Sequence, residues 1–360
     1  MIEAPPYPAA LQPLTTLRFF AALVVIIHHF GYFAPYPVEE YTSFLKKGYL
    51  AVDFFFILSG FILTHAYAGA IRAGKFNRYD FLRRRFARIY PVHIVVLLFM
   101  AVVAVTPLHF GPIKDWPGAY PWDLLVHNIL LIQGWGIDDT LGFNIPSWSI
   151  SAEWFAYLLF PLLLPLCMRL QTAFLLLLSI AIYAVTWFVS DYIDPLRPIT
   201  EFTNDFSPIR ILPAFLLGMA LYRYKAVRSP SRIAGWNLGI CTVLAFLFMH
   251  WGLIDITVIP LLALIVINAA DLVRVDRQGW LARPTAVWLG EISYSLYMVH
   301  YPVMVLVMYS AQLHLSAQDY QWASWVLAPV SLLLSLIAAA ALYHYIEIPA
   351  RRLITCRKPV

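Results

Sequence analysis

Charged residues are scarce in this chain. Only 12% of its 360 residues are Asp, Glu, Lys or Arg, and 61% are hydrophobic, whereas an ordinary soluble domain carries roughly a quarter charged residues. A chain of this composition cannot cover itself with a polar surface, which argues against a soluble globular protein. Its apolar residues fall into separate runs of about 20 residues, each long enough to cross a hydrocarbon core roughly 30 Å thick.

Cysteine is also rare. Cys167, Cys241 and Cys356 lie far apart, with no CxxC pair and no metal-like Cys/His spacing, so we expect no disulfide, no metal site and no permanently bound cofactor. The first residues lack a basic region and a small-residue cleavage site, and we expect no removable signal peptide. Because no internal repeat, low-complexity tract or polar linker divides the chain, residues 1–360 are predicted to form one integral-membrane domain.

The apolar runs predict an all-α fold, a polytopic transmembrane helix bundle of about ten spans. Residues 123–134 are apolar enough for a dipping or interfacial helix, and a full crossing there would break the parity of the spans. The ten candidate spans are 14–34, 50–71, 89–108, 148–168, 171–190, 207–225, 236–253, 255–272, 286–311 and 322–347.

Basic residues concentrate in the connectors on one side of these spans. With ten spans, those connectors and both termini share a side, and the positive-inside rule makes that side cytoplasmic. Membrane topology thus explains the net charge of +5, so we expect membrane lipids as partners and no nucleic acid. The basic residues include Arg78, Arg83, Arg223, Lys225, Arg228, Arg232, Arg274, Arg277, Arg283, Arg351, Arg352, Arg357 and Lys358; the opposite connectors carry Glu39, Glu40, Asp138, Asp139, Asp191, Asp194 and Asp205.

The first span contains two ionisable residues, Arg18 and His29, eleven positions apart. On a helix this separation returns to within roughly 20° of the same face and covers about 16 Å. A neutral imidazole can take a proton from a hydroxyl near neutral pH, so His29 is a candidate general base. Alternatively, Arg18 snorkels to the membrane surface as a topology anchor and His29 hydrogen-bonds a neighbouring helix.

The second span carries Asp53, followed directly by three phenylalanines. A carboxylate at this depth needs a partner, and a basic residue of the first span is the obvious one. Asp53 could orient His29 as the acidic member of a catalytic triad orients its imidazole, or it could be only a polar residue at the outer end of the span. For Ser59 and Gly60 we expect simple small-residue packing against another helix.

An arginine cluster precedes the third span. Guanidinium groups match phosphate oxygens in bidentate geometry, so Arg84, Arg85 and Arg88 are candidates for binding a ligand's phosphates. The alternative is a positive-inside cluster that only fixes topology. Arg88 has apolar neighbours on both sides and is harder to explain in that way.

A polar and aromatic segment begins the fourth span. Aromatic faces with polar edges suit carbohydrate, which makes Trp148, Ser151 and Tyr157 candidate substrate-binding residues. The aromatic residues could instead form an interfacial belt, but a belt does not explain the carboxylate of Glu153. Arg210, at another outer helix start, could contact an acceptor, but contact with a lipid headgroup is the role we expect.

In their order and spacing these residues resemble the bacterial integral-membrane acyltransferase family 3, whose members O-acylate surface polysaccharides and related glycans. The likeness covers nearly the whole chain, and His300 within it is predicted to be a packing histidine. The segments that carry it are Arg18 with His29, 53–61, 84–91, 148–157, 289–302 and 347–352.

The resemblance implies an enzyme of the bacterial inner or plasma membrane. Its donor substrate would be acyl-CoA, acetyl-CoA first, entering from the cytoplasm and contacting the arginine cluster. His29 would be the base, with Arg18, Asp53 and Glu153 as further catalytic candidates. The acceptor would be a polysaccharide or lipid-linked oligosaccharide; exopolysaccharide precedes lipopolysaccharide as our expectation.

Some members of this family append an extracytoplasmic hydrolase-like domain, whereas this sequence ends soon after the last candidate span. We therefore expect transfer to finish within the membrane domain or with a separate partner. The alternatives to an enzyme are a transporter or flippase, because aligned polar residues in a bundle also build substrate paths, and a non-enzymatic subunit of a polysaccharide assembly system.

Overall fold

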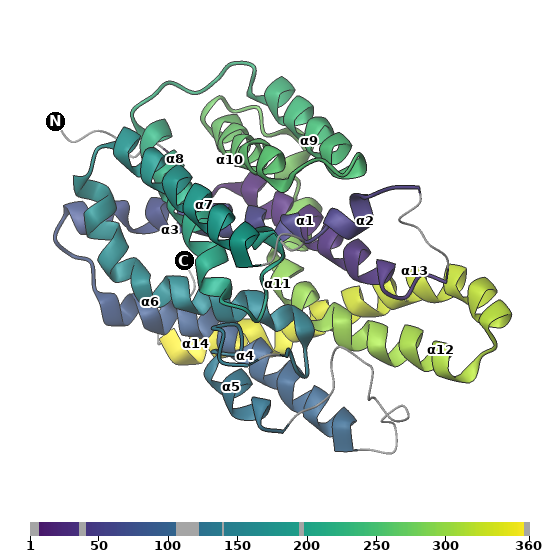
Figure 1. Ribbon diagram of the computed structural model, residues 1–360. Helices are drawn as coiled ribbons and strands as arrows, with labels where there is room; N and C mark the ends of the chain where they lie inside the picture. The colour runs from purple at the N-terminus through teal and green to yellow at the C-terminus, as the bar shows by residue number, and fades with distance from the viewer. Residues whose placement is uncertain (1–6, 36–40, 106–121, 139, 194–197, 356–360) are drawn as a thin grey trace.

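The computed structural model describes residues 7–35, 41–105, 122–138, 140–193 and 198–355, which form helices joined by turns and contain no strand (Figure 1). Seven residues named in the predictions above lie outside these ranges: Glu39, Glu40, Asp139, Asp194, Cys356, Arg357 and Lys358. The longer helices are α1 (Gln12–Gly31), α3 (Leu50–Arg72), α4 (Arg78–Val105), α6 (Trp148–Arg169), α7 (Thr172–Ile193), α8 (Ser207–Ala226), α9 (Ala234–His250), α10 (Val258–Arg274), α11 (Pro284–Met304) and α13 (Ala317–Leu342).

Short helical segments connect these helices. A π-helical segment, η7, follows α11, and a second one, η8, joins α13 to the last helix. The short elements are α2 (Phe44–Lys47), α5 (Leu124–Leu130), η3 (Ile145–Ser147), η4 (Ile199–Glu201), η5 (Asp255–Thr257), η6 (Gly279–Ala282), η7 (Val305–Tyr309), α12 (Ser310–His314), η8 (Tyr343–Glu347) and α14 (Ile348–Thr355).

The prediction of an all-α polytopic membrane bundle is confirmed. Each of the ten predicted spans coincides with a helix, and eight helical segments of the described chain are long and apolar enough to cross a membrane. The other two are α9, which is shorter at 17 residues, and α8, whose 20 residues include Arg210, Arg223 and Lys225. The count of ten spans and the cytoplasmic termini stay predictions.

The apolar segment 123–134 does not form a span. Its helix, α5, has seven residues and is therefore only about 10 Å long, whereas a hydrocarbon core is roughly 30 Å thick. A helix that ends within the segment fits the expected dipping or interfacial element, and it leaves the predicted parity of the spans unchanged.

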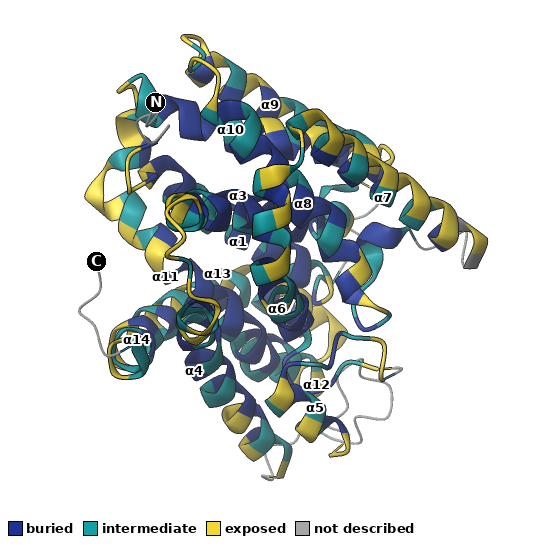
Figure 2. Ribbon diagram, turned by 90° about the vertical axis from the view of Figure 1, so that its left-hand side faces the viewer, coloured by how far each residue is buried: buried dark blue, intermediate teal, exposed yellow. Residues whose placement is uncertain are grey.

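The bundle has a buried centre and an apolar periphery. In the segment built around α11, 78% of the most apolar stretch is buried, whereas for α7 the value is 17%; Figure 2 shows α7 as a largely exposed helix beside the dark-blue centre. Large apolar side chains such as Leu162, Phe188 and Trp325 are about two thirds exposed or more. Because water would make such a surface costly, lipid is the solvent that this surface requires.

Glycines bring two helix pairs into backbone contact. A Cβ on Gly60 of α3 or on Gly218 of α8 would collide with the backbone of the facing helix, and a Cβ on Gly290 of α11 would collide with the backbone of Thr15 in α1. The packing role expected for Gly60 is confirmed. The α3–α8 and α1–α11 contacts matter for function, because these four helices carry many of the polar residues described next.

Candidate active site

Two cavities lie end to end inside the bundle. The inner cavity, about 190 Å³, is lined by residues of α1, α3, α4, α6 and α11, and it includes two of the three expected donor arginines, Arg85 and Arg88. The outer cavity, about 730 Å³, lies at the other end of α1 and contains His29. Val52 and Tyr297 line both cavities.

Three guanidinium groups line the inner cavity, and two of them lack an anionic partner. Arg18 and Arg85 form no ion pair with any residue that the structure describes. The Nε atom of Arg85 is buried without a hydrogen bond, and its guanidinium lies 5.9 Å from the ring centre of Tyr157. Buried guanidinium groups without a paired carboxylate are costly at this depth, and an anionic ligand would stabilise them.

The third guanidinium, that of Arg88, is held in place. It pairs with the fully buried Glu347 of η8, and it lies 5.3 Å from the ring centre of Tyr294. Ser295 donates a hydrogen bond to Glu347 at 3.0 Å, and Arg351 lies 3.5 Å from the same carboxylate. These contacts anchor Arg88 to the end of the chain, so it borders the cavity as an oriented group.

Glu153 is the carboxylate of the inner cavity. Ser59 of α3 donates a hydrogen bond to Glu153 at 3.0 Å, and Tyr157, one helical turn further on, also donates to it. Two hydroxyl donors on one oxygen stabilise the ionised carboxylate. Ser59, expected to serve only helix packing, also lines the cavity, a position that sequence spacing did not indicate.

At the outer cavity the hydrogen bonds define the tautomer of His29. Its Nδ1 lies 2.9 Å from the backbone oxygen of Val25, and because a carbonyl only accepts, Nδ1 carries the hydrogen. The lone pair is then on Nε2, which has no hydrogen-bond partner among the described residues. An imidazole in this state can accept a proton from a bound hydroxyl.

The neighbouring histidine is different. His28 donates from Nδ1 to the backbone oxygen of Leu45 at 2.5 Å, and its Nε2 accepts from the Tyr32 hydroxyl at 3.1 Å. Both ring nitrogens are occupied, so His28 is a structural group, although it also lines the outer cavity. The hydrogen bonds thus show which of the two adjacent histidines has a nitrogen available as a base, which their position in the sequence does not show.

His300 of α11 lies against His29. Its Nε2 is 3.2 Å from His29 Nδ1, the ring centres are 5.0 Å apart, and His300 is fully buried. The packing of α1 against α11 brings together the two helices that carry these rings. His300, predicted to be a packing histidine, also contacts the candidate base.

Asp53 pairs with Arg210 rather than with a residue of the first span, which corrects the expected partner. Arg210 donates to Asp53 at 2.8 Å and to the backbone oxygens of Tyr49 and Phe202 at 3.0 and 3.2 Å. The Trp148 ring centre lies 4.8 Å from this guanidinium. The reason is the α3–α8 backbone contact, which places α8, not α1, beside the carboxylate.

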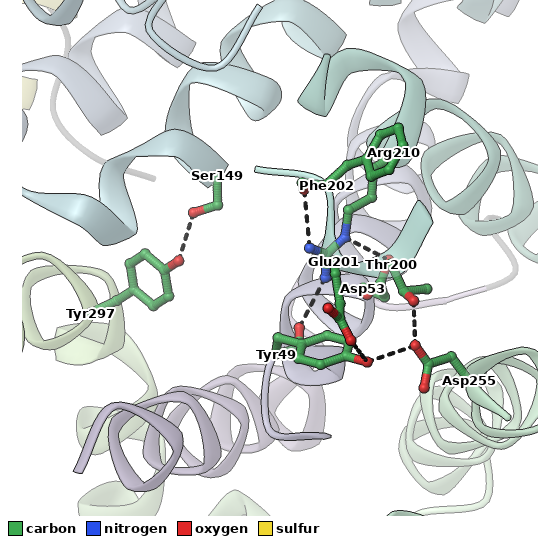
Figure 3. Close-up of polar contacts among 9 residues, drawn as sticks. All are labelled: Tyr49, Asp53, Ser149, Thr200, Glu201, Phe202, Arg210, Asp255 and Tyr297. Atoms are coloured by element: carbon green, nitrogen blue, oxygen red, sulfur yellow. Dashed lines mark hydrogen bonds and ion pairs between the residues drawn. The ribbon is translucent and has the colours of Figure 1, made fainter. Parts of the chain in front are cut away.

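The lipid-headgroup role expected for Arg210 is wrong as well, because its side chain is only 2% exposed. Figure 3 shows Arg210 and Asp53 next to a second polar group, in which Asp255 accepts hydrogen bonds from Tyr49 at 2.7 Å and from Thr200. Lys47 also pairs with Asp255 at 2.5 Å. This network joins the starts of α3, α8 and α10 along one wall of the outer cavity.

Two expected contact residues do not line either cavity. Arg84 turns outward and pairs with Asp80 at 2.7 Å. Ser151 is fully buried, where it donates to the backbone oxygen of Leu131 at 2.8 Å and accepts from the backbone N–H of Gly134 at 3.1 Å. Each of the two residues has an immediate neighbour in the sequence that does line the inner cavity.

The remaining candidates divide between the two cavities. Trp148 lines the outer cavity, and Tyr157 lines the inner one. Arg18 lines the inner cavity about three helical turns from His29, roughly 16 Å along α1, so the shared helix face spans both compartments. Sequence reasoning missed Ser149 and Tyr297, whose hydroxyls meet at 2.7 Å between the cavities; a tyrosine inside an apolar span was the available signal.

The sequence is similar to known acyltransferases. A family profile described as "Acyltransferase domain" matches residues 13–344. The chain is 31% identical to "Acyltransferase MdmB" of Streptomyces mycarofaciens, over 99% of this chain and 95% of that protein. It is 26% identical to "O-acetyltransferase OatA" of Staphylococcus aureus over 96% of this chain but only 58% of OatA, so it spans little more than half of that protein. No solved structure matches.

These matches and the helix bundle define a class, that of multi-pass membrane O-acyltransferases. The chain belongs to the acyltransferase family of integral-membrane enzymes that its sequence resembles. Family membership therefore favours an enzyme over the transporter, flippase and assembly-subunit alternatives.

Proposed function

We propose that this O-acyltransferase takes an acetyl or other acyl group from acyl-CoA in the inner cavity and transfers it to a sugar hydroxyl of a cell-surface polysaccharide in the outer cavity. His29 is the general base of this reaction, in the inner or plasma membrane of a bacterium. The observation that carries the proposal is the hydrogen-bonding state of His29, whose Nδ1–H is engaged with Val25 and whose Nε2 lone pair has no partner among the described residues.

The inner cavity supports acyl-CoA as the donor. A CoA thioester carries several phosphate charges at one end and its acyl group at the other. Arg18 and Arg85, which have no carboxylate partner in the described chain, and the anchored Arg88 offer guanidinium groups to those phosphates. The apolar lining from α3, including Phe55 and Ile62, suits the uncharged pantetheine arm.

The reaction then follows from the position of His29. The acceptor hydroxyl gives its proton to His29 Nε2 while its oxygen attacks the thioester carbonyl carbon. The C–S bond breaks, the CoA sulfur leaves as a thiolate, and the imidazolium returns the proton to give free CoA thiol. A relay in which His29 first accepts the acyl group is a second chemical route to the same products.

The outer cavity supports a polar, ring-shaped acceptor. Trp148 and Tyr49 present aromatic surfaces there, and Glu201 and Lys46 add groups that can hydrogen-bond hydroxyls. The OatA relatives are named O-acetyltransferases, which agrees with an oxygen nucleophile. An exopolysaccharide repeat unit, free or lipid-linked, is the acceptor we favour; the O-antigen of lipopolysaccharide is the second.

The test is acceptor-dependent release of CoA thiol from acetyl-CoA by purified protein in nanodiscs, with a polysaccharide-bearing membrane extract as acceptor. His29→Ala is expected to lower the rate by about 10²- to 10⁴-fold. His28→Ala is the matched control and should keep most of the activity, because both nitrogens of His28 are already engaged. Equal rates for wild type and His29→Ala would contradict the assignment of the base.

A further inference from the structure

Two residues, one from α11 and one from α3, form the partition between the inner and outer cavities. Tyr297 of α11 and Val52 of α3 are the residues that line both cavities among those described. Tyr297 is 6% exposed and Val52 is 4% exposed, so neither is a surface residue of a wide channel. These two side chains therefore border the point where the inner and outer cavities adjoin.

The ring of Tyr297 is held firmly in this position. Its hydroxyl lies 2.7 Å from Ser149 Oγ (Figure 3). The same hydroxyl lies 3.1 Å from the backbone oxygen of Pro146, and together these contacts tie α11 to the start of α6. Its ring centre is 6.1 Å from that of Phe55 and 5.8 Å from that of His300. Hydrogen bonds on the tip and aromatic contacts on the ring restrict rotation out of the passage.

This position has a consequence for the donor. The cations that suit the CoA phosphates line the inner cavity, whereas His29 lines only the outer one. For the thioester carbonyl to reach a hydroxyl at His29, the acyl group has to leave the inner cavity for the outer one, and Val52 and Tyr297 are the residues that border both. The space between the two cavities therefore limits the size of the acyl group that can reach His29, before any bond is broken.

We infer that Tyr297, with Val52 opposite, determines which acyl group the enzyme transfers. The partition admits a narrow, unbranched acyl group such as acetyl and excludes one branched next to the carbonyl. This inference rests on the proposed function, because it assumes that the donor is an acyl-CoA bound in the inner cavity. It adds a specificity-determining residue that takes no part in proton transfer.

Neighbouring residues on α11 provide the contrast. Tyr294, one turn before Tyr297, lines the inner cavity only and donates its hydroxyl hydrogen to the backbone oxygen of Ile89. His300, one turn after Tyr297, contacts His29 and lines neither cavity. Of these three residues on one helix face, only Tyr297 stands in the passage.

The experiment compares acetyl-CoA with isobutyryl-CoA as donors for the full-length protein in nanodiscs. The measured quantity is the ratio of kcat/KM for the branched donor to that for the straight one. Tyr297→Ala and, independently, Val52→Ala are expected to raise this ratio about tenfold or more, the scale on which a pocket distinguishes single methyl groups. Tyr297→Phe keeps the ring and should keep the wild-type ratio.

Tyr294→Ala is the matched control, since it removes the same side chain from the inner cavity alone and should leave the ratio unchanged. If Tyr297→Ala does not reach the membrane, Val52→Ala decides the question. An unchanged ratio in the well-folded widening variants, with acetyl transfer intact, would overturn the role of Tyr297. Absence of acceptor-dependent CoA release in the wild type would instead overturn the proposed function.

Discussion

His300 Nε2 lies 3.2 Å from His29 Nδ1 in the interior of the bundle. The hydrogen on His29 Nδ1 already points toward the backbone oxygen of Val25 at 2.9 Å. Because His29 Nδ1 carries that hydrogen, His300 Nε2 can only accept it, which leaves the hydrogen of His300 on Nδ1, a buried atom with no hydrogen-bond partner among the described residues. The pair thus favours one tautomer and one orientation of His29, the one with Nε2 available as a base.

Replacing His300 tests this relationship. We expect His300→Ala to lower kcat by about 10- to 100-fold while the KM for acetyl-CoA stays near the wild-type value, because a loosened base loses alignment without altering the donor cavity. His300→Gln should recover part of the rate, since its amide oxygen can accept the same hydrogen. Steady-state kinetics on both variants supply the measurement, and a change confined to KM would contradict a positioning role.

The arginine cluster gives a second prediction. Arg85→Ala should raise the KM for acetyl-CoA at least tenfold, because it removes a guanidinium that lines the inner cavity. Arg84→Ala is the matched control: Arg84 pairs with partly exposed Asp80, and such surface pairs contribute only about 0–1 kcal/mol. Titration of acetyl-CoA in the kinetic assay compares the two neighbours, and equal increases in KM would argue against donor binding at Arg85.

The buried pair of Asp53 and Arg210 gives a third prediction. Asp53→Ala leaves the Arg210 guanidinium buried without its carboxylate, which is expected to lower the free energy of unfolding by about 3–5 kcal/mol. Arg210→Ala should have an effect of similar size, and the double variant should lose less than the sum of the two. Denaturant unfolding in detergent measures all three, and additive losses would show that the residues act independently.

The glycine contact gives a fourth prediction. Gly60→Ala places a Cβ against the backbone of α8 and should destabilise the protein by about 1–3 kcal/mol. Gly69, in the same helix, has no atom within 4 Å of the equivalent Cβ position, so Gly69→Ala should be neutral or stabilising by up to about 1 kcal/mol. Thermal unfolding of the two variants distinguishes them, and matching shifts would contradict close α3–α8 packing.

Some features of the site were accessible from sequence because they depend on one helix. The eleven-residue separation of Arg18 and His29 places both on a continuous face of α1. In the structure Arg18 lines the inner cavity and His29 lines the outer one. The small side chain of Gly60 predicted a close helix approach, which the α3–α8 contact confirms. Helix periodicity alone was sufficient for these inferences.

Other features required knowledge of which helices touch. Asp53 finds its partner 157 positions away in Arg210, and His29 meets His300 after 271 positions; helix periodicity carries no information on such pairings. Arg84 and Arg85 are adjacent cations with the same local propensity. Only the packing of α4 decides that Arg84 faces Asp80 at the surface and Arg85 faces the cavity.

The sequence by itself determined that this protein is a helical membrane bundle of the acyltransferase family, because apolar run length, charge scarcity and motif order are properties of the chain read locally. The tertiary structure decided how the polar residues are distributed between an inner cationic cavity and an outer cavity with His29, and that Tyr297 stands between them. Each of those relationships depends on side chains from at least two helices, and the direction in which a side chain faces is set by its packed neighbours.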